Sequence, residues 1–118
     1  MREYRRHGVD YAYNHRPHGA CDYADGFGAE ILSRGLLDKL QASDLSARHR
    51  EHVTLAVVDG TIPALTHACI APKELAYPKL RFDVDTAYDL AELESIVSKE
   101  PRALELPAFK IIRITLPE

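Results

Sequence analysis

Residues 80–90 read LRFDVDTAYDL and join an expected strand to an expected helix. Apolar and charged side chains alternate through the first six positions, and this period of two predicts a strand over 80–85. The charged side chains share one face of that strand: Arg81, Asp83 and Asp85. A helix is expected from Thr86, because Thr86 and Asp89 have the spacing of a capping box with Asp in place of Glu. This stretch therefore predicts a sheet with a helix packed on it.

The segments on either side continue the alternation of strands and helices. The helix from Thr86 should bury an apolar stripe of Leu90, Leu93, Ile96 and Val97 and end before Pro101. Strands are expected over 9–13, 29–32, 65–70 and 109–116, the last from its strong β propensity. Further helices are expected over 2–7 with Gly8 as the stop, from Ser33, and from Asp44 or Ser46 to Val58. The pattern favours an α/β or α+β sheet with helices packed on it, in a single domain over 1–118.

Composition and charge limit the class of protein to which the chain can belong. The 118 residues are 46% hydrophobic and 28% charged, as in an ordinary globular protein. A net charge of −3 with no basic stripe argues against nucleic-acid binding and against a polybasic membrane face. The basic start lacks the apolar core of a signal peptide, and two distant cysteines, Cys21 and Cys69, indicate reduced thiols. We therefore expect a cytoplasmic protein without a membrane segment.

Asp83 and Asp85 are the first candidates for chemistry. Two carboxylates on one face of a strand, at its carboxyl end, suit Mg²⁺ that bridges phosphate oxygens in nucleotidyl transfer. The alternative is structural: Asp85 or Thr86 caps the next helix, and Asp83 pairs with Arg81. Spacing alone leaves both interpretations open.

Three other clusters were weighed in the same way. His15, His18 and Cys21 are spaced for zinc, with His67 or Cys69 as a fourth ligand, or they belong to a polar loop. Residues 48–52 (RHREH) present cations that grip a carboxylate or phosphate, or form a solvated helix face. Residues 25–30 (DGFGAE) form either a simple turn or a binding loop, in which the glycines would let backbone amides approach a ligand.

Four segments in this order resemble the cytidylyltransferase family of sugar nucleotidyltransferases, which includes spore-coat-polysaccharide and CMP-acidic-sugar synthetases. They are residues 9–14 (VDYAYN), 23–31 (YADGFGAEI), 50–54 (REHVT) and 80–90. The resemblance implies a nucleotide-diphospho-sugar transferase-like mixed sheet. It also implies transfer of CMP from CTP to a sugar for surface polysaccharide, with Mg²⁺ as cofactor.

The resemblance also implies roles for particular residues. Asp85 matches the metal-binding aspartate of the family, and Asp83 matches an extra acidic position of sialic-acid-type relatives. The substrate-binding residues implied near the sugar pocket and the dimer contact are Asp25, Gly26, Glu30, Arg50, Glu51 and His52. No catalytic side chain is assigned, because nucleotidyl transfer depends on positioning and charge neutralisation.

The likeness covers only the sugar-side, C-terminal half of such an enzyme. The family's glycine-rich nucleotide loop and second aspartate are not among these residues, and Gly28, Leu55 and Ala87 depart from its pattern. We expect a chain that is inactive alone, is completed by an N-terminal half on another polypeptide, and forms a homodimer or larger homo-oligomer. The alternatives are a non-catalytic homodimeric binding module and a small zinc-binding α/β protein.

Overall fold

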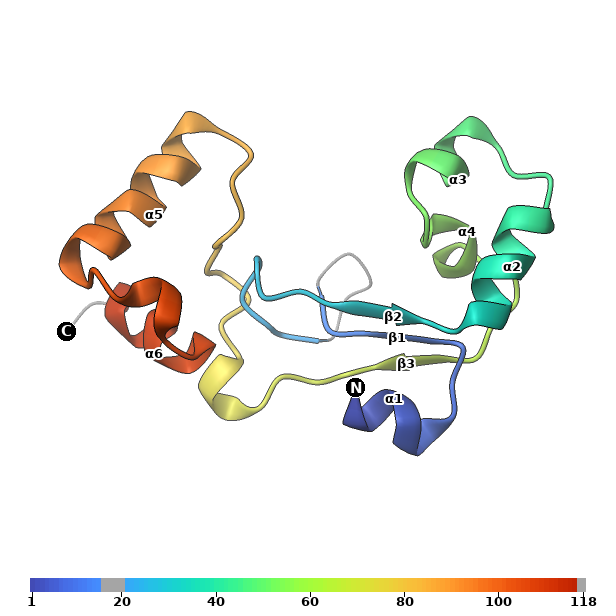
Figure 1. Ribbon diagram of the computed structural model, residues 1–118, viewed down its shortest axis with the longest axis horizontal. Coiled ribbons are helices and arrows are strands. Elements are labelled where there is room, and N and C mark those ends of the chain that lie inside the picture. The colour runs from blue at the N-terminus through green and yellow to red at the C-terminus, as the bar shows by residue number, and fades with distance from the viewer. Residues whose placement is uncertain (16–20, 117–118) are drawn as a thin grey trace. The chain divides into compact units, whose positions relative to one another are not determined.

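The computed structural model describes residues 1–15 and 21–116. The chain divides into two compact units (Figure 1). The first, called the sheet unit here, comprises residues 1–13 and 29–69. The second, called the helical unit, comprises residues 14–28 and 70–118. Each unit is described by itself.

A small mixed sheet forms the centre of the sheet unit. Its strands are β1 (Tyr11–Tyr13), β2 (Glu30–Leu32) and β3 (Thr66–Ala68), in the order β2-β1-β3. β1 pairs antiparallel with β2, with Tyr11 opposite Leu32, and parallel with β3, with Tyr11 opposite Thr66. The α/β class, the mixed sheet and the three strands expected in this part of the chain are confirmed. The finer transferase-like fold stays a prediction.

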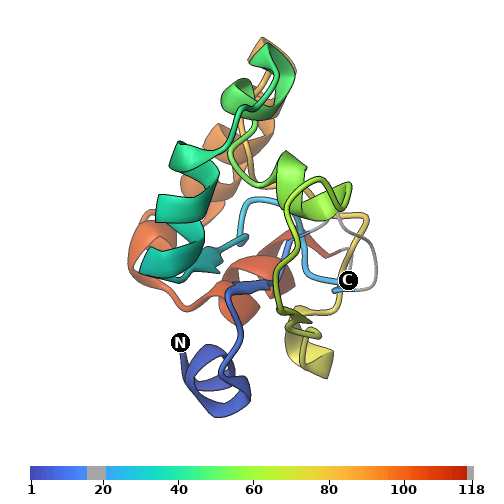
Figure 2. The same cartoon turned by 90° about the vertical axis from the view of Figure 1, so that its right-hand side faces the viewer.

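The sheet unit also contains four helices. Helix α1 (Arg2–His7) precedes β1 in the sequence. Between β2 and β3 come α2 (Arg34–Ala42), α3 (Ala47–Glu51) and α4 (Leu55–Val58). Helix α1 leads into β1 through Gly8, whose left-handed backbone ends the helix as expected (Figures 1 and 2). The Ser33 hydroxyl accepts a hydrogen bond from the backbone N–H of Leu36, and Ser46 caps α3 in the same way. Both predicted caps are confirmed.

One apolar cluster holds the sheet unit together. Its buried members come from β1, α2, α4 and the turn after α4: Tyr11, Leu36, Leu40, Ala56, Val57 and Ile62. The single helix predicted up to Val58 is wrong, because the chain leaves helical geometry at His52 and re-enters it at Leu55. Val53 and Thr54 are adjacent β-branched residues with restricted rotamers in a helix, which lowers the helix propensity at the interruption.

Within its described residues, the helical unit contains two α-helices and two short 3-10 helices. These are η2 (Lys73–Leu75), α5 (Ala87–Lys99), η3 (Ala103–Glu105) and α6 (Ala108–Thr115). The capping box of α5 is confirmed: the Thr86 hydroxyl accepts from the Asp89 N–H, and the Asp89 carboxylate accepts from the Thr86 N–H. The apolar stripe predicted for α5 is less buried than expected. Leu93 and Ile96 are half-buried, Leu90 and Val97 are exposed, and no residue of the helix is fully buried.

Two predicted strands in this unit are wrong. Residues 80–85 form no strand: Arg81 makes an isolated bridge with Asp25, and its side chain turns back to the two aspartates instead. Alternation specifies a strand only where a neighbouring strand completes the ladder. Residues 109–116 lie largely in α6, where Lys110 and Arg113 are three apart and one apolar face buries Ile112. The helical period of this face outweighed the β propensity of its residues.

No helix in the described part of the chain is both long enough and apolar enough to cross a membrane.

Candidate functional site

Arg81, Asp83 and Asp85 form a compact charge cluster just before α5, called the Arg81 cluster here. The guanidinium donates two parallel hydrogen bonds to Asp83, from Nε to Oδ1 at 3.1 Å and from Nη2 to Oδ2 at 2.6 Å. The same Nη2 donates to Oδ2 of Asp85 at 2.9 Å. One cation thus draws two carboxylates to one point at the protein surface.

The charges in this segment shift one another's protonation. The hydrogen bond from Arg81 holds the pKa of the Asp83 carboxyl below its ordinary value, and Asp83 in turn raises the pKa of Arg81. Hydrogen bonds from Thr86 lower the pKa of Asp89. Both interactions favour the ionised carboxylate, at Asp83 through its pairing with Arg81 and at Asp89 through its bonds in the helix cap.

The contacts predicted by the structural interpretation of Asp83 and Asp85 are present. Asp83 pairs with Arg81, and Thr86 caps α5. The expected placement at the carboxyl end of a strand is wrong, because there is no strand at 80–85. Two convergent carboxylates still fit Mg²⁺, which takes one or two carboxylates together with water and phosphate oxygens. The metal role of these residues stays a prediction.

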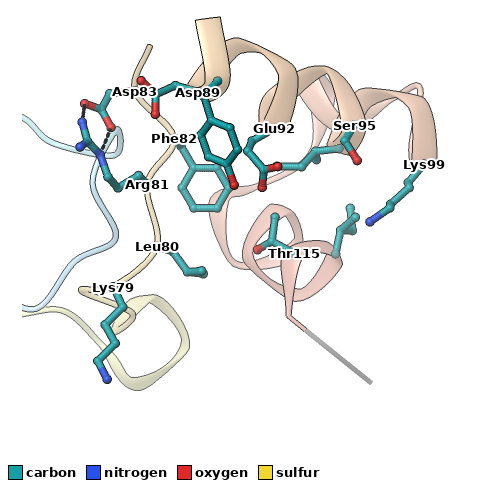
Figure 3. Close-up of a pocket in the computed structure, with 13 residues that line it drawn as sticks. Lys79, Leu80, Arg81, Phe82, Asp83, Asp89, Glu92, Ser95, Lys99 and Thr115 are labelled. Atoms are coloured by element: carbon teal, nitrogen blue, oxygen red, sulfur yellow. Dashed lines mark hydrogen bonds and ion pairs between the residues drawn. The ribbon is translucent and has the colours of Figure 1, made fainter. Parts of the chain in front are cut away.

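A hollow of about 330 Å³ lies beside the Arg81 cluster (Figure 3). Its charged lining contains side chains of both signs: Lys79, Arg81, Asp83, Asp89, Glu92 and Lys99. Three cations and three carboxylates balance, so the hollow suits a polar ligand rich in hydroxyl groups more than a highly charged one. Sequence reasoning missed Glu92 and Lys99. The signal was their spacing from Asp89, at three and ten residues, which places all three on one helix face.

Asp25 and Gly26 lie against the segment that carries the Arg81 cluster. The Asp25 N–H donates to the Leu80 carbonyl at 3.0 Å, and the Phe82 N–H donates to the Asp25 carbonyl at 2.9 Å. Gly26 has a φ of 90°, and a Cβ there would lie 2.6 Å from the Phe82 carbonyl carbon. This glycine is required by close packing, which gives it a structural reason independent of any ligand.

Glu30 sits in the sheet unit, where it joins two other predicted segments. The Tyr11 hydroxyl donates to Oε1 of Glu30, and the Thr54 hydroxyl donates to the same oxygen at 3.3 Å. Burial, and then the hydrogen bond to Glu30, raises the pKa of Tyr11. The Glu30 carboxylate thus ties β2 to β1 and to the start of α4.

Arg50 and Glu51 end α3, and His52 caps it. All three side chains are exposed. Among the residues that the structure describes, Arg48 and Arg50 form no ion pair, so their guanidinium groups face solvent. An exposed guanidinium without a carboxylate partner is a suitable contact for an anionic ligand.

The zinc cluster predicted at His15, His18 and Cys21 is only partly visible. His18 lies outside the described residues, Cys21 is 1% exposed, and His15 lies against Gly28. This zinc assignment stays a prediction.

The search of protein-family models, of curated proteins and of solved structures finds no match to this chain.

Proposed function

We propose that the chain is the sugar-side half of a cytidylyltransferase that transfers CMP from CTP to a sugar for surface polysaccharide. The observation that carries the proposal is the Arg81 cluster, in which Asp83 and Asp85 converge beside a polar hollow. Nucleotide binding would come from a segment outside these 118 residues. The proposal rests on the resemblance of the four segments together with this arrangement.

Contacts between the resembling segments support the proposal. In the sheet unit, Tyr11, Glu30 and Thr54 belong to three different segments and share one carboxylate oxygen. In the helical unit, Asp25 pairs with the backbone of residues 80–82. Segments that are distant in sequence thus contact one another within each unit, as expected if the resembling segments belong to one functional structure.

The Arg81 cluster would hold the cation. Bound Mg²⁺ supplies charge neutralisation at the phosphate oxygens of the nucleotide. Asp83 and Asp85 would donate carboxylate oxygens, and Arg81 would be released from them to contact a phosphate. Both carboxylates already lie at one point, so the main rearrangement needed is the release of Arg81.

Arg50 would bind the acidic group of the sugar. Its exposed guanidinium can make two parallel hydrogen bonds to a carboxylate. We place Glu51 and His52 beside it as donors or acceptors for hydroxyl groups, and Glu30 as the residue that positions this surface through Thr54.

The test is a reconstituted reaction. The chain is mixed with a separately expressed nucleotide-binding half of a CMP-sugar synthetase, CTP, Mg²⁺ and N-acetylneuraminic acid, and pyrophosphate release is measured. We expect release that requires this chain and falls about a hundredfold or more in Asp85→Ala, because a metal ligand is lost. Glu94→Ala, an exposed carboxylate of α5, is the matched control and should leave the rate unchanged. Equal rates in wild type and Asp85→Ala would overturn the assignment.

A non-catalytic homodimeric module is the second candidate, favoured by an apolar hollow of about 190 Å³ in the helical unit. Its lining includes Phe27, Phe82, Leu93, Ile111 and Leu104, and Leu104 is 90% exposed. A protruding leucine beside an apolar hollow is self-complementary, so two copies related by a two-fold axis would each fill the other's hollow.

Sedimentation equilibrium separates this candidate from a monomer. Leu104→Glu should dissociate the dimer, and Leu65→Glu, an equally drastic change at an exposed leucine of the sheet unit, should not. A wild-type chain that is monomeric throughout the accessible concentrations would reject the module.

A further inference from the structure

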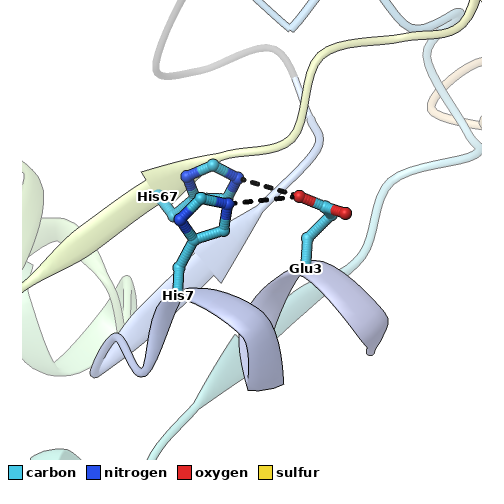
Figure 4. Close-up of side chains that lie close together, drawn as sticks. All are labelled: Glu3, His7 and His67. Carbon is cyan, nitrogen blue, oxygen red and sulfur yellow. Dashed lines mark ion pairs between the residues drawn. The ribbon is translucent and has the colours of Figure 1, made fainter.

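Helix α1 and strand β3 bring three metal-binding side chains together in the sheet unit (Figure 4). Glu3 and His7 are four residues apart in α1 and therefore share one face of the helix. His67 is the central residue of β3. Figure 4 shows both imidazole rings directed at the Glu3 carboxylate.

The spacing of these groups differs from that of ordinary hydrogen bonds. Oε2 of Glu3 lies 3.3 Å from Nε2 of His7 and 3.7 Å from Nε2 of His67. Hydrogen bonds between nitrogen and oxygen usually span about 2.7–3.2 Å. Tetrahedral zinc with bonds of about 2.0–2.1 Å separates its ligand atoms by roughly 3.3 Å. The observed distances are closer to the separation of two ligands around a metal ion.

The two imidazoles are stacked, with ring centroids 3.9 Å apart and planes inclined by 19°. An imidazole nitrogen binds a metal ion in the plane of its ring, so one of the two rings would turn for both nitrogens to reach the same ion. The three ligand atoms lie within 4.8 Å of one another, so a small movement of exposed side chains would close them around an ion. The side chains of Glu3 and His7 are exposed and that of His67 is partly so, which leaves a fourth position open to water.

Cys69 adds a fourth metal-binding group nearby. His67 and Cys69 are two residues apart, and the Cys69 N–H continues the pairing with β1 by donating to the Tyr13 carbonyl at 2.7 Å. Their side chains therefore project from the same face of the extended chain.

We propose that Glu3, His7 and His67 form a site for a borderline divalent transition ion, with Zn²⁺ as the probe. Two imidazole nitrogens and one carboxylate oxygen are a donor set typical of zinc, whereas Mg²⁺ and Ca²⁺ require oxygen donors. This site involves none of the residues of the proposed transferase. It differs from the cluster predicted at His15, His18 and Cys21, for which His67 was one of two candidates for the fourth ligand, because Glu3 and His7 supply the other ligands here. An ion here would fasten α1 to the sheet.

Calorimetric titration of the metal-stripped full chain with ZnCl₂ tests the site. We expect one equivalent to bind, and the affinity to fall about tenfold or more in His7→Gln and in His67→Gln, since each variant loses a direct ligand. His49→Gln removes another histidine of the same unit, which is paired with Asp59, and should leave the affinity unchanged. Cys69→Ser should lower it by less than about tenfold, because three ligands remain.

The controls distinguish this site from its competitors. Loss of binding in His15→Gln with full binding in His67→Gln would overturn the proposal and place zinc at the other cluster. Absence of saturable binding would also overturn it, whatever the result for nucleotidyl transfer. Circular dichroism checks that each variant is folded. If a variant unfolds, zinc-induced shifts of the His7 and His67 ring signals in the wild-type NMR spectrum give the same answer, and unshifted signals contradict the site.

Discussion

The sheet unit and the helical unit bury different kinds of side chain. The sheet unit has a contiguous cluster of large residues, including Tyr11, Leu36 and Leu40. In the helical unit the buried residues are mostly small: Cys21, Ala24 and Ala103, with Ile112 as the large exception. Several large apolar side chains of α5 and the segments around it stay exposed. Hydrophobic stabilisation grows with apolar area buried, so the sheet unit should resist unfolding more strongly.

The first prediction compares a buried with an exposed leucine. Leu36→Ala should lower the free energy of unfolding of the sheet unit by about 2–5 kcal/mol, because the 3% exposed side chain leaves a cavity. Leu104→Ala in the helical unit should change stability by less than about 0.5 kcal/mol. Urea unfolding followed by hydrogen exchange at individual amides measures both. Equal losses would mean that the two units do not differ as described.

The second prediction concerns the tight turn of the helical unit. Gly26→Ala should destabilise that unit by about 1–3 kcal/mol, because the backbone has a φ of 90° and the new Cβ would strike Phe82. Gly35→Ala is the control, since nothing lies within 4 Å of a Cβ there. It should be neutral or slightly stabilising, because alanine favours the helix. Amide exchange near residues 80–82 should accelerate only in Gly26→Ala, and slow exchange there would contradict the packing.

The third prediction uses one helix cap from each unit. Thr86→Ala removes the capping box of α5, and Ser33→Ala removes the cap of α2. Each should cost about 1 kcal/mol. The consequences should differ, because α2 is held by buried Leu36 and Leu40 whereas α5 buries no residue. Exchange should therefore quicken throughout α5 but only in the first turn of α2. Faster amide exchange along the whole length of both helices would contradict this difference.

The smallest predicted effect is a pH dependence in the sheet unit. A hydrogen bond between His49 Nε2 and Asp59 Oδ2, at 2.7 Å, is the main cause that lowers the pKa of Asp59 from 3.8 to about 2. A depressed folded-state pKa stabilises the fold above the unfolded value, and this contribution is lost as pH falls from about 4 to about 2. Asp59→Asn should flatten that part of the curve of stability against pH. An unchanged curve would show that the contact between His49 and Asp59 does not contribute to stability.

Sequence reasoning was most reliable where several local signals agreed with tertiary pairing. Ser33, Gly8 and the strand of Tyr11–Tyr13 were predicted because capping chemistry and alternation operate within a few residues. The strand at 80–85 could not be rejected from the sequence, since its failure depends on which segment lies beside it. The helix of residues 108–115 has a helical face that its β-prone composition concealed.

The candidate site was predictable to a similar degree. The sequence indicated that Asp83 and Asp85 lie together and, as the structural alternative, that Asp83 pairs with Arg81, and this ion pair is present. The second ion pair, between Arg81 and Asp85, was not predicted. The hollow beside them depends on how α5 and α6 pack, which no local pattern reveals. The cluster of Glu3, His7 and His67 joins residues 60 or more positions apart, so only the β1–β3 pairing and the position of α1 bring it together.

The most direct measurement of the central claim is a Mn²⁺ titration of the ¹⁵N-labelled chain in the presence of CTP, followed by NMR. Mn²⁺ accepts the oxygen ligands that Mg²⁺ uses and broadens the signals of nearby amides. The account predicts that the amides of residues 83–86 broaden first, that Mg²⁺ reverses the broadening, and that Asp83→Asn and Asp85→Asn abolish it. Sharp signals at residues 83–86, while exposed carboxylates such as Asp38 or Glu105 broaden, would contradict a cation site at the Arg81 cluster.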